Sequence, residues 1–175
     1  MIKLLDILEN KILVPRRSPE ERSKNFLIAT QKKIQQYIKD GGKGGLNLAG
    51  TPITSLPQGL TVGGNLSLNN TLITTLPQGL KVGGTLNLYG SKITSLPQGL
   101  TVGDNLYLSN TPITSLPKGL KVGGNLRLNN TLITTLPQGL TVGGNLNLRD
   151  TPISKKYSKE QIQQMVPGVK GKIII

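Results

Sequence analysis

The chain has 175 residues, a net charge of +13, and neither Cys nor His. Its length fits one domain of ordinary size. The missing thiols and imidazoles exclude disulfides, Cys- or His-based metal sites and the commonest nucleophiles and general bases. Aromatic residues make up only 3% of the chain, so its core must be aliphatic.

Residues 1–45 are predicted to form a basic, helical N-terminal cap with a net charge of +5. Its first part has four apolar residues at helical spacing before Pro15 ends the pattern. These residues are Leu4, Leu5, Leu8 and Ile12.

A second helix in this cap has a clear start and a clear end. Ser18, Pro19 and Glu21 provide an N-cap, an N1 proline and an acidic N3 residue. The helix should run to about Lys39, before Gly41 and Gly42. The residues expected to cover the first repeat are Leu27, Ile34, Tyr37 and Ile38. The opposite face is a candidate basic surface made of Arg22, Lys24, Lys32, Lys33 and Lys39.

Residues 46–154 repeat with a fixed period of 20, as five full rows and a partial sixth, and carry a net charge of +4. Each row reads close to L-x-L-x-x-T-x-I-T-x-L-P-x-G-L-x-V-G-G-N. Such a period is typical of a solenoid, because one coil cannot bury its apolar side alone. The L-x-L alternation predicts short strands in a parallel sheet. L-P-x-G-L suits a tight corner, and V-G-G suits a second turn or a narrow strand.

These rows resemble bacterial-type leucine-rich repeats, whose L-x-L-x-x-N-x-L-x-x-L-P pattern is matched by Leu66–Leu68, Thr71, Ile73, Leu76 and Pro77. Thr or Ser replaces the usual Asn, and Gly63 stands where that family has its first Leu. The resemblance implies that the hydroxyls of this column cap buried backbone groups between coils. The column contains Thr51, Thr71, Ser91, Thr111, Thr131 and Thr151. These two differences from the family pattern are compatible with a leucine-rich-repeat-like solenoid and with a plain β-solenoid with three short faces.

The whole chain is similar to uncharacterised leucine-rich-like proteins of tailed bacteriophages and some bacteria. The shared features are the G-L-x-V-G-G rows, the basic helical start and an ending with P-G-V-K-G, here within Ser158 to Gly171. This resemblance implies a phage or bacterial source and carries no established activity.

Residues 155–175 are predicted to form a helix–strand C-terminal cap with a net charge of +4. Ser158 and Gln161 make a capping box, and Pro167 ends the helix. Its apolar stripe contains Ile162, Met165 and Val166. The stretch from Lys172 to Ile175 is predicted to be a closing strand that pairs with the last coil, with intermolecular pairing as the alternative.

The outward positions of the L-x-L strands are mostly small and polar, and four residues break that pattern. They are Tyr89, Tyr107, Arg127 and Arg149. Tyr and Arg are the usual anchors of protein interfaces, so these residues form the candidate binding site. The alternative is ordinary surface variation, including a stack of Tyr107 on Arg127 in the next coil.

The sequence predicts a non-enzymatic protein without cofactor or metal. Asp104 and Asp150 are the only acids in the repeats and lie two rows apart, and no nucleotide-binding glycine motif is present. We expect a protein-interaction scaffold that binds a host or virion protein. One alternative is a nucleic-acid or nucleotide binder that uses the basic caps. Another is a structural protein that self-assembles into filaments or forms part of a virion.

The start of the chain lacks the features of a secretory signal. Asp6 and Glu9 interrupt the apolar start, and no small-residue cleavage site follows. No stretch is long enough to span a bilayer. The expected location is therefore the cytoplasm, that of the host cell for a phage protein, or the virion.

Overall fold

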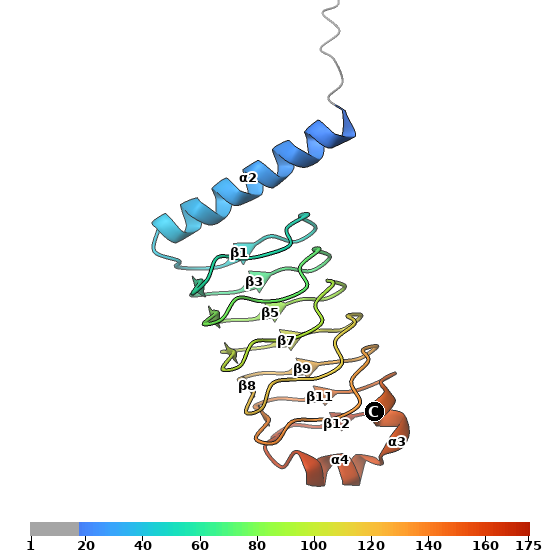
Figure 1. Cartoon of the computed structure of the whole chain (residues 1–175). Coiled ribbons are helices and arrows are strands. Elements are labelled where there is room, and N and C mark those ends of the chain that lie inside the picture. Colours follow the sequence, from blue (N-terminus) through green and yellow to red (C-terminus); the bar gives the residue numbers. More distant parts are fainter. Residues whose placement is uncertain (1–17) are drawn as a thin grey trace, which may run out of the picture.

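The computed structural model describes residues 18–175 and shows a parallel β-solenoid of about five turns. Helix α2, Pro19–Lys39, lies across one end of the stack (Figure 1). Helices α3, Pro152–Lys156, and α4, Lys159–Met165, lie at the other end with the last strand. The predicted solenoid with a helical N-terminal cap and a helix–strand C-terminal cap is confirmed. The amphipathic segment predicted over Met1 to Leu13 lies outside the described residues.

The L-x-L segments form a seven-stranded parallel sheet in the order β1-β3-β5-β7-β9-β11-β12. Each repeat strand pairs with the strand of the next coil at an offset of one period, as Leu46 with Leu66. The strands are β1 Leu46–Asn47, β3 Leu66–Ser67, β5 Leu86–Asn87, β7 Leu106–Tyr107, β9 Leu126–Arg127, β11 Leu146–Asn147 and β12 Ile173–Ile174. The predicted parallel sheet is confirmed, and β12 is the predicted closing strand paired with β11.

The residues before each glycine pair form a second parallel sheet, in the order β10-β8-β6-β4-β2. Its strands are β2 Thr61–Val62, β4 Lys81–Val82, β6 Thr101–Val102, β8 Lys121–Val122 and β10 Thr141–Val142. The sequence is compatible with either a turn or a strand in this segment, and the structure shows a strand. The architecture is therefore a parallel β-solenoid, with two sheets where the sequence suggested three short faces.

The core consists of aliphatic ladders that run along the stack. The leucines of the first and third columns, from Leu46 to Leu148, are at most 2% exposed, and so are the isoleucines from Ile53 to Ile153. Full burial of one such side chain contributes about 1.5–3 kcal/mol. Only Tyr37 and Tyr157 among the aromatic residues pack against this core, and both are partly exposed. The predicted aliphatic core is confirmed.

The corners rely on residues with positive φ. The glycines of the L-P-x-G-L segments, from Gly59 to Gly139, have φ between 65° and 73°. The corner that follows the first sheet uses Gly50 and Gly90 in two coils and Asn or Asp in the others. Those residues are Asn70, Asn110, Asn130 and Asp150, with φ between 56° and 60°. Asn and Asp tolerate this left-handed conformation better than other residues with a side chain.

Helix α2 begins and ends as predicted and covers the first coil less completely than expected. Ser18 and Glu21 form the reciprocal capping box, with Ser18 Oγ accepting from the Glu21 N–H at 3.1 Å. Ile34 is buried, and Leu27 and Tyr37 are partly buried against the core. The prediction for Ile38 was wrong, because this side chain is 41% exposed and lies beside the corner at Leu60.

Lys33 was predicted on the outward face of α2, and its ammonium instead turns towards the first coil. Lys33 Nζ donates to the Asn47 carbonyl oxygen at 2.6 Å. In this sheet, the N–H groups of each coil donate to carbonyls of the next coil, as Leu48 N–H does to Ser67. The carbonyls of β1 have no preceding coil, and Lys33 supplies the donor that Asn47 would otherwise lack.

At the other end, α4 has the predicted capping box, because Ser158 Oγ accepts from the Gln161 N–H at 3.3 Å. Ile162 and Val166 are at most 2% exposed and pack on the core, whereas Met165 is 43% exposed and lies outside the expected apolar stripe. Val169 bridges to Val142, so the C-terminal segment extends both sheets. Helix α3 was not predicted from the sequence.

Candidate binding site on the outward face of the first sheet

Three of the four predicted anchors surround one hollow of about 220 Å³ on the outward face of the first sheet. They are Tyr89, Tyr107 and Arg127, which come from three successive coils. The other lining residues are Asn87, Ser109 and Asn129. We call these six residues the platform hollow. Asn87, Tyr107 and Arg127 point outward, because each lies between two leucines that are buried in the core. Tyr89, Ser109 and Asn129 each follow the second of these leucines.

Sheet register places Tyr107 between Asn87 and Arg127. The Arg127 guanidinium carbon lies 4.8 Å from the centroid of the Tyr107 ring, within cation–π distance. The stack between neighbouring coils, which the sequence left as an alternative to a binding site, is therefore present. It fixes the arginine head group over the ring, and its contribution at an exposed position is about 0.5–1 kcal/mol.

The floor of the platform hollow is polar and held by hydrogen bonds. Ser109 Oγ donates to Asn129 Oδ1 at 2.6 Å, and Ser109 is only 4% exposed. Asn87 Oδ1 accepts from the Tyr89 N–H at 3.1 Å. Tyr89 itself is 45% exposed. The hollow thus combines a fixed polar floor with an exposed aromatic rim.

Arg149 does not line the platform hollow. It follows β11, one coil beyond Asn129, and its side chain is exposed. Its backbone N–H donates to Asn147 Oδ1 at 3.1 Å. The structure therefore brings three predicted anchors together and leaves the fourth beside them.

Three of the five predicted basic side chains of α2 form an exposed surface, and Arg22, also exposed, interacts with other groups. Lys32 and Lys39 line a hollow along one side of the helix with Ile28 and three glutamines. Lys24 is exposed. Lys33 is occupied by the Asn47 carbonyl.

A second hollow, on the outward side of the second sheet, was not predicted from the sequence. Thr101, Lys121, Thr141 and Lys170 lie along a hollow of about 490 Å³ there. The signal was present in the residue before each buried valine, which alternates between Thr and Lys. Unlike the platform hollow, this surface has no aromatic side chain.

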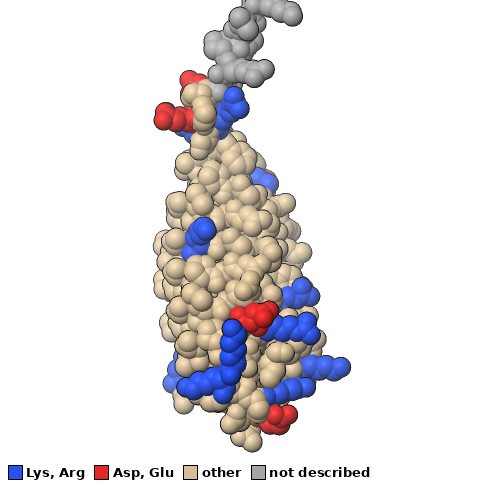
Figure 2. Space-filling view, turned by 90° about the vertical axis from the view of Figure 1, so that its right-hand side faces the viewer, with Lys and Arg blue, Asp and Glu red and all other residues tan. Residues whose placement is uncertain are grey.

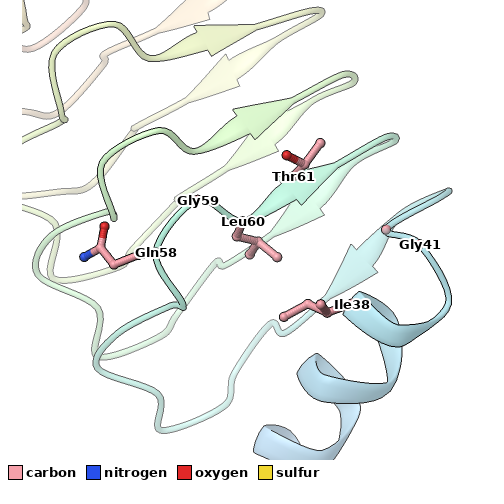
Figure 3. Close-up of a pocket in the computed structure, with 7 residues that line it drawn as sticks. Ile38, Gly41, Gln58, Gly59, Leu60 and Thr61 are labelled. Atoms are coloured by element: carbon pink, nitrogen blue, oxygen red, sulfur yellow. The ribbon is translucent and has the colours of Figure 1, made fainter.

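A further hollow of about 280 Å³ lies at the seam between α2 and the first coil (Figure 3). Ile38, Leu60 and Thr61 line it together with Gln58 and glycines. Among the described residues that line it, none is charged or aromatic. We therefore place the candidate site at the platform hollow.

The charge of the described residues is uneven. Figure 2 shows basic side chains gathered near the end that carries α3 and α4, and few charges over the middle repeats.

The pKa of Glu160 lies below its usual value, because its carboxylate accepts hydrogen bonds from its own backbone N–H and from Ser158. Among residues 18–175 there is no group of three or more acidic residues placed to hold a metal.

A comparison with protein families gave no match, and no curated protein sequence proved similar. Within the described part of the chain, no helix combines the length and apolarity needed to cross a membrane.

Proposed function

We propose that this protein is a non-enzymatic scaffold that binds another protein through the platform hollow. The carrying observation is the Tyr107–Arg127 stack beside the exposed Tyr89, on a sheet whose backbone is fixed by in-register pairing. Tyr and Arg dominate the energetics of protein interfaces, and a rigid support reduces the entropy lost on binding. The resemblance to phage and bacterial proteins supports a host or virion protein as the partner, met in the cytoplasm or in the particle.

The chemistry of the platform hollow supports binding more than catalysis. Its hydroxyls belong to Tyr89, Tyr107 and Ser109, and within residues 18–175 no carboxylate lines it to act as a base. The chain has no imidazole. The Ser109 hydroxyl donates to a neutral amide oxygen, which cannot activate it.

Site-specific photocrosslinking tests this proposal. A photoreactive phenylalanine analogue replaces Tyr89 in one variant and the exposed Gln98, at an L-P-x-G-L corner, in a control. We expect the analogue at position 89, and not at 98, to capture one protein from an extract of the source cells. The captured protein, once purified, should bind the unmodified chain. Equal capture at both positions, or capture of nucleic acid alone, would contradict the proposal.

Nucleic-acid binding is a second candidate function, favoured by the gathered basic side chains in Figure 2 and by Lys32 and Lys39 on one side of α2. Binding through phosphates would weaken steeply with salt. Changing Lys32 and Lys39 together to Glu should then weaken retention on single-stranded DNA or RNA at low salt. Unchanged retention would remove α2 from this proposal.

A further inference from the structure

The guanidinium of Arg127 lies over the Tyr107 ring and has no acidic partner among residues 18–175. It stacks on Tyr107 from the next strand and is exposed to solvent. Within residues 18–175, no carboxylate forms an ion pair with it. The planar guanidinium presents several N–H donors in a rigid fork that matches a carboxylate. Stacking on the ring orients this fork before any ligand arrives.

The outward positions of the first sheet contain no acid to compete for Arg127. The two outward columns of the first sheet hold Asn, Ser, Ala, Tyr and Arg side chains and no Asp or Glu. Arg149 continues the positive charge one coil further towards the C-terminal cap. The nearest acid in sequence to Arg149 is Asp150, whose backbone occupies the left-handed corner position. The field of this face therefore favours an anionic partner.

The same details favour an acidic protein segment over a nucleic acid. Arg127 is the only cation among the described residues that line the platform hollow, whereas a nucleic-acid backbone needs several cations along its path. Arg127 also covers one face of Tyr107, which leaves less ring surface for base stacking. The neutral floor of Asn87, Ser109 and Asn129 suits amide groups of a peptide.

We propose that the platform hollow recognises an acidic segment of the partner protein. A carboxylate of that segment pairs with the Arg127 fork, and a neighbouring apolar side chain rests on the exposed ring of Tyr89. This inference rests on the proposed function and adds the chemical class of the partner.

Fluorescence anisotropy with labelled probes on the full chain tests the inference. The probes are a short peptide in which Glu alternates with Phe, the matched peptide with Gln in place of Glu, and a short oligothymidylate. We expect the acidic peptide to bind about tenfold more tightly than the Gln peptide near physiological salt. Arg127→Gln should remove that preference, and Arg127→Lys should restore only part of it, because Lys has no planar fork.

Lys92→Gln is the matched control, because it also removes one exposed positive charge and lies outside the platform hollow. It should leave acidic-peptide binding unchanged. Equal losses from Arg127→Gln and Lys92→Gln would overturn the inference and indicate unspecific attraction to a basic chain. Tighter binding of the oligothymidylate, with the same dependence on Arg127, would overturn it in favour of nucleic acid.

The two proposals fail in distinguishable ways. If crosslinking at position 89 captures a partner and the acidic peptide shows no preference over the Gln peptide, the scaffold proposal stands and the acidic partner is excluded. If position 89 captures no protein and neither peptide binds, both proposals fail.

Discussion

Single glycines set the distance between coils. A comparison of Gly123→Ala with Gly119→Ala distinguishes the cost of close approach between coils from the cost of backbone strain. A Cβ at Gly123 would lie 2.0 Å from the Gly103 carbonyl oxygen, so Gly123→Ala must push two coils apart. At Gly119, where φ is +69°, no heavy atom lies within 4 Å of a Cβ. We expect Gly123→Ala to lower the free energy of unfolding by about 3 kcal/mol or more. Gly119→Ala should cost about 1–2 kcal/mol through its left-handed backbone. Urea denaturation measures both, and equal losses would refute the steric argument.

A second pair concerns the hydroxyl column of the repeats. Thr131 Oγ1 donates to the Leu128 carbonyl at 2.6 Å and is buried, whereas the buried Ser91 hydroxyl has no hydrogen-bond partner among residues 18–175. Thr131→Val should therefore cost about 1–3 kcal/mol, because it leaves a buried carbonyl unsatisfied. Ser91→Ala should be neutral or slightly stabilising, because it removes an unpaired polar group. Thermal unfolding of the two variants checks this, and a larger loss from Ser91→Ala would contradict it.

Some of these residue-scale features could be predicted and others could not. The Thr hydroxyls were expected to cap backbone groups between coils, and five of them instead donate to the carbonyl three residues earlier in their own coil, as Thr71 Oγ1 does to Leu68. The Ser91 hydroxyl makes no such hydrogen bond among the described residues, although the Ser91 N–H donates to the Leu88 carbonyl. The Lys33 bond to Asn47 was beyond prediction, because it depends on the angle at which α2 crosses the first coil. The Gly, Asn or Asp that recurs at the corner after the first sheet predicts its left-handed backbone, because these residues tolerate positive φ.

At the scale of elements, α4 closes the end of the apolar core. Ile162 is 0% exposed there, whereas Met165 on the same helix is 43% exposed. Ile162→Ala should cost about 2–5 kcal/mol and expose the last coil, so we expect it to increase self-association. Met165→Ala, the control, should change neither property. Chemical denaturation together with light scattering measures both effects, and a monomeric Ile162→Ala variant of normal stability would contradict the capping role.

The elements were predictable where local signals and burial agreed. Helix α2 matched its expected bounds, because the capping box at Ser18 and the glycines after Lys39 act locally. Helix α3 was missed because T-P-I-S continues the repeat pattern, while Thr151 in fact caps a helix through the Ser154 N–H. The strands of the second sheet could not be distinguished from turns in the sequence, because V-G-G gives too short a segment for alternation to identify a strand.

At the scale of the whole molecule, near-identical coils made departures from the pattern easy to find. Tyr89, Tyr107 and Arg127 stood out because the other outward residues are small and polar, and strand register then placed them together. The shape of the hollow could not be predicted, since it depends on the burial of Ser109 and its hydrogen bond to Asn129. The repeats therefore act as a support on which a few substitutions create a surface.

The same regularity implies that the molecule tolerates loss of one complete coil. Deleting residues 66–85 joins Asn65 to Leu86, keeps every ladder in register and leaves the platform hollow intact. Because each coil contacts mainly its neighbours, the free energy of unfolding should fall by only about 1–3 kcal/mol. Deleting residues 66–75 removes β3 but keeps β4, so β1 and β5 lose their common partner. That variant should lose cooperative unfolding, which circular dichroism during urea titration would reveal. Similar behaviour of the two deletions would show that coil register does not control folding.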